Sequence, residues 1–250
     1  MAVSFDHSLS PTSVKGPRMA LQVMFHQSLP GSLLDVGCGN GAWARAALKL
    51  GVKDVLGVDG GEVKQNQLLI PSARFRSQLL NESFSLGRKF DVALCLEVGE
   101  HLDEAHAKTL ITNLVAHSDC IYFSAACPGQ PGQFHLNCQW PAYWQELFNE
   151  VHYVCDDAVR WELWNVTELE YYYRQNIFLA RRDKQRAGRE PRIQPVIHPE
   201  MMNFWQAHSA ADKRLRWLRQ VEAGSQTVSW YLSVPAKAFG RKLNRKLSAR

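Results

Sequence analysis

Three glycines at alternate positions, Gly37, Gly39 and Gly41, follow a short apolar run and precede a helical pattern. Glycines placed in this way let the backbone approach a ligand closely and turn sharply into a helix. The first N–H groups of such a helix have no partner within the helix. Asp59 ends the next predicted strand, where a carboxylate can accept hydrogen bonds from both hydroxyls of a ribose. The pattern predicts a site for a nucleoside-containing cofactor.

Asp35, two positions before the first glycine, distinguishes two classes of cofactor. Residues 37–42 also fit the loose dinucleotide fingerprint G-x-G-x-x-G/A. A carboxylate at this place would repel a pyrophosphate, whereas it would attract a sulfonium cation and its ammonium group. We therefore favour a sulfonium methyl donor over a dinucleotide. Both readings rank above a plain turn in which Asp35 only caps backbone groups.

Two further side chains are candidates for contacts with the reacting groups. Glu97 lies at the end of the predicted strand 90–96, and its carboxylate would face the crevice where ligands bind in open parallel sheets. His135 lies in the long loop after the predicted strand 120–125, over the same crevice. Histidine accepts a proton near neutral pH, so we interpret His135 as the base for a hydroxyl acceptor. The alternative for His135 is a structural hydrogen bond within its loop.

The acidic and imidazole side chains near this crevice also raise the question of a metal. Glu97, Glu100 and His101 lie within five residues at a strand-to-helix junction. With His135 they would supply two carboxylates and two imidazoles to a divalent ion, which would lower the pKa of a bound hydroxyl. The alternative is that Glu100 and His101 brace the following helix. We rank this bracing role above the metal site.

The elements that must position these residues follow from hydrophobic periodicity. Apolar runs separated by helical patterns predict strands that alternate with helices, which is typical of a doubly wound, mainly parallel α/β sheet. Two late strands close together in the sequence predict an antiparallel edge, giving seven strands in all. The expected helices cover approximately residues 19–25, 40–50, 97–114 and 141–148, and the expected strands approximately 33–36, 55–59, a poor strand from 75, 90–96, 120–125, 151–155 and 177–180.

Composition and charge divide the chain of 250 residues into parts. Hydrophobic residues make up 46%, as in an ordinary globular protein with a core, and no apolar run is long enough to span a bilayer. The six cysteines form no C-x-x-C pair, and the first residues lack the apolar core of a signal peptide, so we expect reduced thiols and a cytoplasmic protein. We predict a flexible arm over 1–17, the α/β domain over 18–181, and a basic linker and helical tail over 182–250.

The tail differs from the domain in charge. Residues 181–250 carry a net charge of +11, whereas the first 180 residues carry −6. Apolar residues at Phe239, Leu243 and Leu247 recur every four positions beside lysines and arginines, which is typical of a helix lying in an anionic membrane interface. The alternatives are a helix docked on the acidic domain, a subunit contact, or a tail that binds nucleic acid without specificity. Residues 181–192 are read as linker.

Several segments resemble a known enzyme family. Leu33 to Gly41 with Gly57-Val58-Asp59 looks like the first two motifs of class I S-adenosylmethionine-dependent methyltransferases, and residues 90–102, reading E-V-x-E-H-L at their end, look like the fourth-strand motif. Residues 124–130, 135–144 and 173–176 resemble a subgroup of bacterial methyltransferases found near glycan-biosynthesis genes. The similarity covers about residues 30–180.

The resemblance implies a Rossmann-like fold and S-adenosylmethionine as cofactor. The residues implied to bind it are Asp35, Gly37, Gly39, Gly41, Asp59 and Glu97. The resemblance does not fix the substrate, and we expect O-methylation of a hydroxyl on a sugar or lipid-linked glycan. Related sequences carry an acidic residue near the end of the third strand to contact adenine, whereas this chain has Leu79 there, so Gln78 or backbone groups would take over that contact.

Alternative functions stay open at this point. One is N- or O-methylation of a small metabolite. A nucleic-acid acceptor ranks lower because the catalytic part is acidic. A partner subunit without activity ranks lower still, because the glycine turn, Asp59, Glu97 and His135 are all intact.

Overall fold

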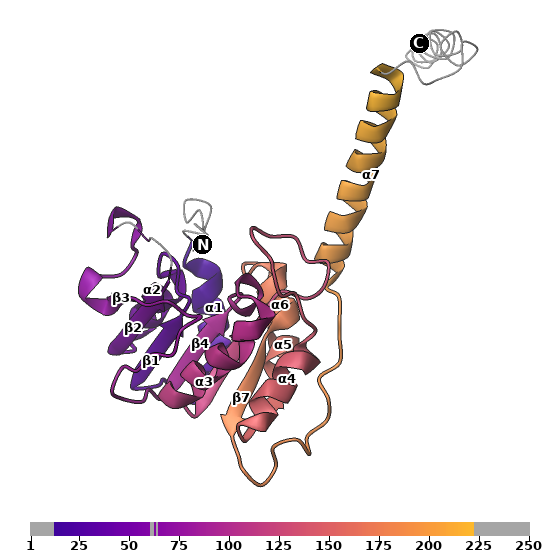
Figure 1. Ribbon diagram of the computed structural model, residues 1–250. Helices are drawn as coiled ribbons and strands as arrows, with labels where there is room; N and C mark the ends of the chain where they lie inside the picture. The colour runs from indigo at the N-terminus through magenta and orange to yellow at the C-terminus, as the bar shows by residue number, and fades with distance from the viewer. Residues whose placement is uncertain (1–12, 61–62, 64, 223–250) are drawn as a thin grey trace. The chain divides into compact units, whose positions relative to one another are not determined.

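The computed structural model describes residues 13–60, 63 and 65–222. Within these residues, seven strands form one sheet in the order β3-β2-β1-β4-β5-β7-β6 (Figure 1). The first five strands pair in parallel, and β7 runs antiparallel between β5 and β6. This confirms the predicted doubly wound, mainly parallel sheet with an antiparallel edge. The strands are β1 (Ser32–Val36), β2 (Asp54–Asp59), β3 (Phe75–Ser77), β4 (Val92–Leu96), β5 (Cys120–Ser124), β6 (Tyr153–Asp156) and β7 (Phe178–Arg182).

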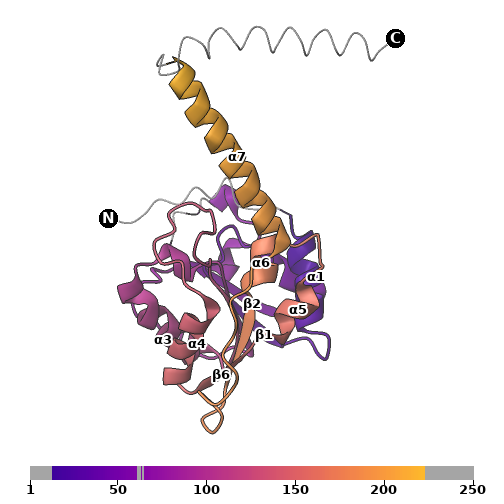
Figure 2. The same ribbon diagram turned by 90° about the vertical axis from the view of Figure 1, so that its right-hand side faces the viewer.

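Helices cover both faces of the sheet (Figures 1 and 2). Because side chains alternate along a strand, Leu33 and Leu94 enter the core beneath α1, α2 and α5, whereas Leu34 and Ala93 enter the core beneath α3 and α4. Burial on both faces explains why the central strands read as continuous apolar runs. The helices are α1 (Lys15–Met24), α2 (Ala42–Leu50), α3 (Ala107–His117), α4 (Pro141–Glu150), α5 (Ala158–Leu163), α6 (Tyr171–Asn176) and α7 (Pro199–Glu222).

The order of the strands determines where a ligand can bind. The chain runs outward from β1 through β2 to β3 and then returns to place β4 on the other side of β1. The loops that leave the carboxyl ends of β1 and β4 therefore diverge toward opposite faces of the sheet, and a crevice opens between them. The glycine turn follows β1, and Glu97 follows β4, so the fold brings both to this crevice.

Several boundaries differ from the sequence predictions. Helix α1 begins at Lys15, inside the arm predicted over 1–17, while residues 1–12 of that arm lie outside the described part of the chain. Strand β4 begins at Val92 rather than at residue 90, because the Asp91 carboxylate instead accepts a hydrogen bond from the Ser32 N–H at 2.9 Å. The six-residue helices α5 and α6 were not predicted, since so short a helix shows little hydrophobic periodicity in the sequence.

The segment after β7 corrects the prediction of a linker. The Glu190 carboxylate accepts hydrogen bonds from the side chains of Asn149 (2.6 Å) and Gln145 (3.2 Å) and from the backbone N–H of Cys155 (3.1 Å). Ile193 is buried in the core beneath α3 and α4. The compact unit accordingly extends to Met201, and not only to residue 181. This segment is rich in charged residues and proline, yet it packs against the domain because Glu190 and Ile193 make specific contacts there.

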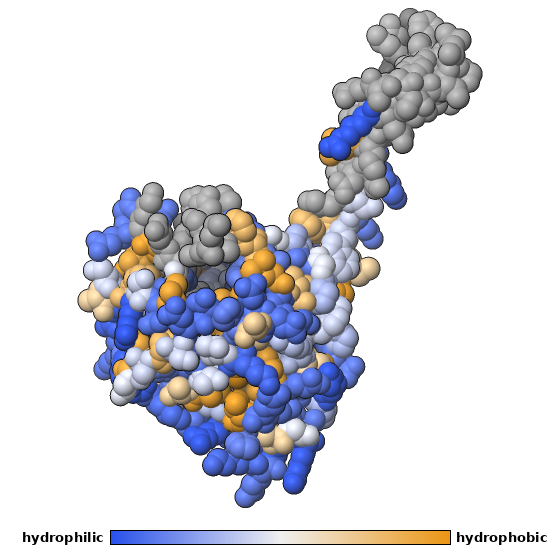
Figure 3. All heavy atoms as spheres, viewed as in Figure 1, coloured by the Kyte–Doolittle hydropathy of each residue, from blue (hydrophilic) through white to orange (hydrophobic). Residues whose placement is uncertain are grey.

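Residues from Met202 onward form a second unit. Its described part continues α7 as far as Glu222. The apolar stripe predicted at Phe239, Leu243 and Leu247 lies outside the described residues. The face drawn in Figure 3 is mostly hydrophilic, with apolar residues in small scattered groups. No helix within the described ranges is long and apolar enough to cross a membrane.

Candidate active site

The glycine turn between β1 and α2 is fixed by the end of β2. The N–H groups of Gly37 and Cys38 both donate to the carbonyl oxygen of Val58, at 2.8 and 3.1 Å. Gly37 has φ +75°, and a Cβ there would lie 2.3 Å from a methyl carbon of Val98. Gly39 and Gly41 have φ +52° and +84°, a region that favours glycine. The predicted requirement for glycine is therefore met by both conformation and space.

Asp59 connects the end of β2 to this turn. Its Oδ2 atom accepts a hydrogen bond of 2.7 Å from the N–H of Gly39. The carboxylate and the glycine backbone therefore approach the crevice together, as the sequence predicted. Both line one cavity of about 490 Å³.

Asp35 lies beneath the turn and is almost fully buried, with 3% of its surface exposed. Its carboxylate accepts a hydrogen bond of 3.1 Å from the N–H of Ala44 in α2. Burial raises the pKa of Asp35 to about 7, against the lowering effect of that hydrogen bond and with a further rise from the charge of Asp59. The ionised form is thus costly at this buried position, and a nearby cation would relieve that cost.

Glu97 is held by two amides that the sequence prediction did not identify. Its carboxylate accepts hydrogen bonds from Gln130 Nε2 at 2.6 Å and from Asn176 Nδ2 at 3.2 Å. Asn176 also donates to Gln130 Oε1 at 2.8 Å. Glu97 has φ +57°, an uncommon conformation for a side chain of this size, and such strain is typical of ligand sites. Gln130 and Asn176 lie in two of the segments that resemble the methyltransferase subgroup, 124–130 and 173–176. This resemblance was the one feature of the sequence that could have identified them.

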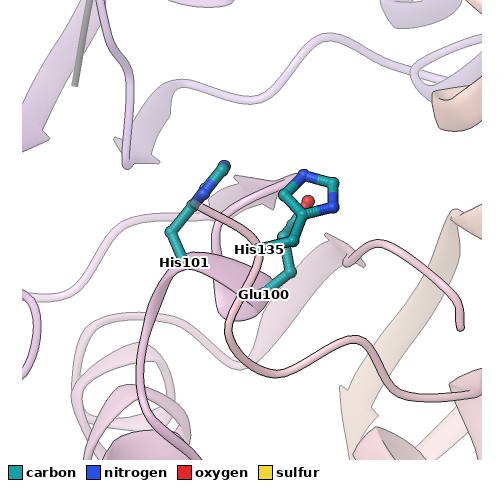
Figure 4. A group of neighbouring side chains, drawn as sticks. All are labelled: Glu100, His101 and His135. Atoms are coloured by element: carbon teal, nitrogen blue, oxygen red, sulfur yellow. The ribbon is translucent and has the colours of Figure 1, made fainter. Parts of the chain in front are cut away.

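Glu100, His101 and His135 form a cluster beside Glu97 (Figure 4). The first two lie in the short turn Gly99–His101 after β4, and His135 comes from the loop after β5. One potential ligand atom from each side chain lies within 4.8 Å of the others, and the two imidazole rings are 5.2 Å apart between centroids. The structure therefore brings together three of the four predicted metal ligands. Glu97 instead bonds to Gln130 and Asn176.

The cavity is acidic and has an apolar mouth. None of the described residues that line it is a lysine or an arginine. Among the lining residues Leu79, Phe134 and Leu136 are between 43% and 54% exposed. Leu79, which stands where related sequences carry an acid, forms part of the wall, while Gln78 Nε2 donates to the carbonyl oxygen of Leu79. The described carboxyl groups of the lining are Asp35, Asp59, Glu97, Glu100, Asp103 and Glu170.

Comparison with known proteins identifies what this arrangement is similar to. Residues 16–170 match a family model described as a methyltransferase domain. A sugar N-methyltransferase from a Streptoalloteichus species has a similar structure, with a TM-score of 0.53 and 14% identity over 73% of this chain and 95% of that one. A magnesium protoporphyrin IX methyltransferase from Synechocystis matches with a TM-score of 0.49 and 19% identity, covering 66% of this chain and 80% of that one. No curated protein matches the sequence.

The burial of Asp35 predicts how stability depends on pH. The folded-state pKa of about 7 lies above the ordinary 3.8, so the folded chain binds this proton more tightly than the unfolded chain, and stability falls as pH rises from about 4 to about 7. Asn at this position keeps an acceptor for the Ala44 N–H but carries no charge. Asp35→Asn should therefore raise the free energy of unfolding at about pH 8 by about 2–4 kcal/mol, and the gain should disappear near pH 4.

Urea unfolding of the ligand-free protein at several pH values measures this difference. Asp103→Asn is the matched control, because Asp103 also lines the cavity but is exposed. Equal stabilities of wild type and Asp35→Asn across the whole pH range would contradict the expected cost of the buried charge.

Proposed function

The chain belongs to the methyltransferase-domain family, and from this premise we propose that it transfers the methyl group of S-adenosylmethionine to a hydroxyl oxygen of a sugar, free or within a lipid-linked glycan. The observation that carries the proposal is the acidic cavity at the end of the glycine turn. Carboxylates that line a cavity without lysine or arginine among its described residues attract a sulfonium cation and repel phosphates.

The described residues match the parts of this cofactor. The backbone at Gly37 and Gly39 leaves room for close approach, and the Asp59 carboxylate suits the ribose hydroxyls. Asp35, whose ionised form is costly because the side chain is buried, gains from a positive charge nearby. These residues orient the donor, and the sulfonium itself supplies the leaving group.

The reaction we propose is an in-line displacement. The hydroxyl oxygen of the acceptor attacks the methyl carbon, the bond between that carbon and sulfur breaks, and sulfur keeps the electron pair, which leaves S-adenosylhomocysteine. The hydroxyl proton must be removed. Nδ1 of His135 lies 3.1 Å from the carbonyl oxygen of Gln130, a contact that requires the proton on Nδ1 and leaves a lone pair on Nε2. In the absence of any other activating group, this lone pair takes the proton.

The acceptor site favours a neutral molecule. The exposed ring of Phe134 and the side chains of Leu79 and Leu136 at the mouth suit the apolar face of a sugar ring or another small ring. Phe134 adopts φ +50°, so its backbone is strained where the ring meets solvent. The acidic lining disfavours a nucleic-acid acceptor. A small metabolite methylated on oxygen or nitrogen remains the second candidate, since the same cavity would admit it.

The test of cofactor binding is Asp59→Ala. Loss of hydrogen bonds from two ribose hydroxyls should weaken S-adenosylhomocysteine binding by about 10–100-fold. Asp54→Ala is the matched control, because Asp54 begins the same strand at its opposite end and pairs with Arg88 on the surface. Titration calorimetry measures both, with circular dichroism to check that each variant is folded. Equal affinity in Asp59→Ala and wild type would refute the assignment of the cofactor site.

The test of His135 is its replacement by alanine. Transfer of labelled methyl groups to a panel of mono- and oligosaccharides first identifies an acceptor. With that acceptor, His135→Ala should lower turnover by about a hundredfold or more, while affinity for S-adenosylhomocysteine stays within about twofold. His26→Ala, an exposed histidine near the end of α1, provides the control. Turnover at the wild-type rate would return His135 to a purely structural role.

We also propose that residues 202–250, called the tail, bind an anionic membrane surface. Lys213, Arg214 and Arg219 are exposed on α7, and Trp205 and Leu215 are exposed apolar residues of the same helix. Basic residues near an anionic leaflet contribute about 1 kcal/mol each, and exposed aromatic and aliphatic side chains add burial in the interface. A tail of this kind would keep the enzyme where lipid-linked glycans are assembled.

Vesicle flotation tests the tail. The full chain should float with phosphatidylglycerol vesicles at low salt but not with phosphatidylcholine vesicles, and a chain ending at Met201 should float with neither. Reversal of charge at Lys213, Arg214 and Arg219 to glutamate should reduce flotation. If the full chain stays at the bottom of the gradient with anionic vesicles, membrane binding is wrong and the tail serves contacts with protein or nucleic acid.

A further inference from the structure

We propose that Glu100, His101 and His135 bind a divalent transition-metal ion at the acceptor end of the cavity. The inference rests on the proposed function, because it assigns to this cluster the activation of the acceptor. It differs from the sequence prediction in its ligands, since Glu97 is not among them. With the ion bound, Nε2 of His135 is a ligand, and the base role described above belongs to the site without metal.

The strongest observation is the state of Glu100. Its side chain has 1% of its surface exposed, and neither carboxylate oxygen has a hydrogen-bond partner of ordinary geometry among the described residues. Burial of a carboxylate without partners is unfavourable, and folded proteins rarely retain such a group without use. No lysine or arginine among the described residues lines the cavity to compensate the charge of ionised Glu100. A bound cation would compensate that charge.

The two histidines have the arrangement that metal ligands need. Nδ1 of His101 lies 3.4 Å from the carbonyl oxygen of Phe134, and Nδ1 of His135 lies 3.1 Å from that of Gln130. A ring nitrogen that faces a backbone carbonyl carries the proton, so the lone pair of His135 is on Nε2. Metal-binding histidines commonly donate their other N–H to a carbonyl in this way, which fixes the ring.

The space around the cluster also fits an ion. Atoms bound to one ion at about 2.1 Å lie about 3–4 Å apart, and the three potential ligand atoms lie within 4.8 Å, so a small rotation of the side chains completes the set (Figure 4). Gly132 packs closely beside the His135 ring, where a Cβ would lie only 2.0 Å from Nε2, so any other residue there would displace this imidazole.

The donor atoms select the type of metal. The Glu97 carboxylate accepts hydrogen bonds from Gln130 and Asn176, so the ligands available to the ion are two imidazole nitrogens and the Glu100 carboxylate. Imidazole ligands suit zinc, iron, nickel and related ions, whereas magnesium prefers oxygen donors and water. Three protein ligands leave positions for oxygens of the acceptor, so the site fits a hydroxyl with a second oxygen beside it, such as a vicinal diol. A bound divalent ion lowers the pKa of such a hydroxyl.

Metal binding by the full chain, with any affinity tag removed, tests the proposal. Calorimetric titration with Zn²⁺, Co²⁺, Mn²⁺ and Mg²⁺ as separate probes should give one saturable site that prefers the first three. Glu100→Gln and His101→Ala should weaken Zn²⁺ binding at least about a hundredfold. His106→Ala is the matched control, because His106 lines the same cavity outside the cluster, and it should bind like wild type. The visible spectrum of bound Co²⁺ should change in the cluster variants.

Thermal unfolding separates a metal site from a structural brace. Glu100→Gln keeps the shape of the side chain but cannot supply an anionic ligand, so Zn²⁺ should raise the unfolding midpoint of wild type by several degrees but not that of the variant. A lower midpoint together with unchanged Zn²⁺ affinity would overturn the proposal in favour of bracing. So would the absence of saturable binding of any of the four ions to wild type.

S-adenosylhomocysteine binding distinguishes a failure of the metal site from a failure of the proposed function. If wild type and Glu100→Gln both bind it while neither binds an ion, the metal site fails and the proposed function stands. If wild type binds an ion but not S-adenosylhomocysteine, the proposed function fails while the cluster remains a metal site.

Discussion

The pairing of β1 with both β2 and β4 is the constraint on which the rest of the structure depends. Parallel neighbours on either side of β1 bring the carboxyl ends of these strands to one edge, and the loops that follow must diverge from there. The carbonyl oxygen of Val58 accepts two N–H groups of the glycine turn, which fixes that turn to the end of β2. Asp35, Asp59 and Glu97 reach a common cavity because their strands end together.

Electrostatics at this edge opposes stability and favours function. Asp35 and Glu100 are buried and Glu97 is half-buried, and all three have raised pKa values, mainly because burial penalises the charged forms. They differ in how far hydrogen bonds reduce that penalty. Asp35 accepts one backbone hydrogen bond, Glu97 accepts hydrogen bonds from two amides, and Glu100 has none of ordinary geometry. Ionisation therefore costs least at Glu97, more at Asp35 and most at Glu100. A bound cation would matter more in the same order.

The sequence predicted the parts of the site that lie close together along the chain. The turn from Asp35 to Gly41 is a local pattern, and glycine is needed there for reasons visible in the sequence. The partners of Glu97 were missed because Gln130 and Asn176 lie 33 and 79 residues away and only the folded chain brings them together. Packing of Glu190 was missed for a related reason. Its surroundings are polar and charged, and three specific hydrogen bonds outweigh that composition.

The buried carboxylate of Asp35 has a consequence for the life of the protein in a cell. A ligand that binds the folded state stabilises it according to its concentration relative to its dissociation constant. Because ionisation of buried Asp35 is costly, a cationic ligand relieves a cost that the ligand-free chain bears in full. Proteases act on transiently opened chains. Degradation of this protein should accordingly be fastest when its ligand is scarce, so that its abundance follows the supply of methyl donor without any dedicated regulator.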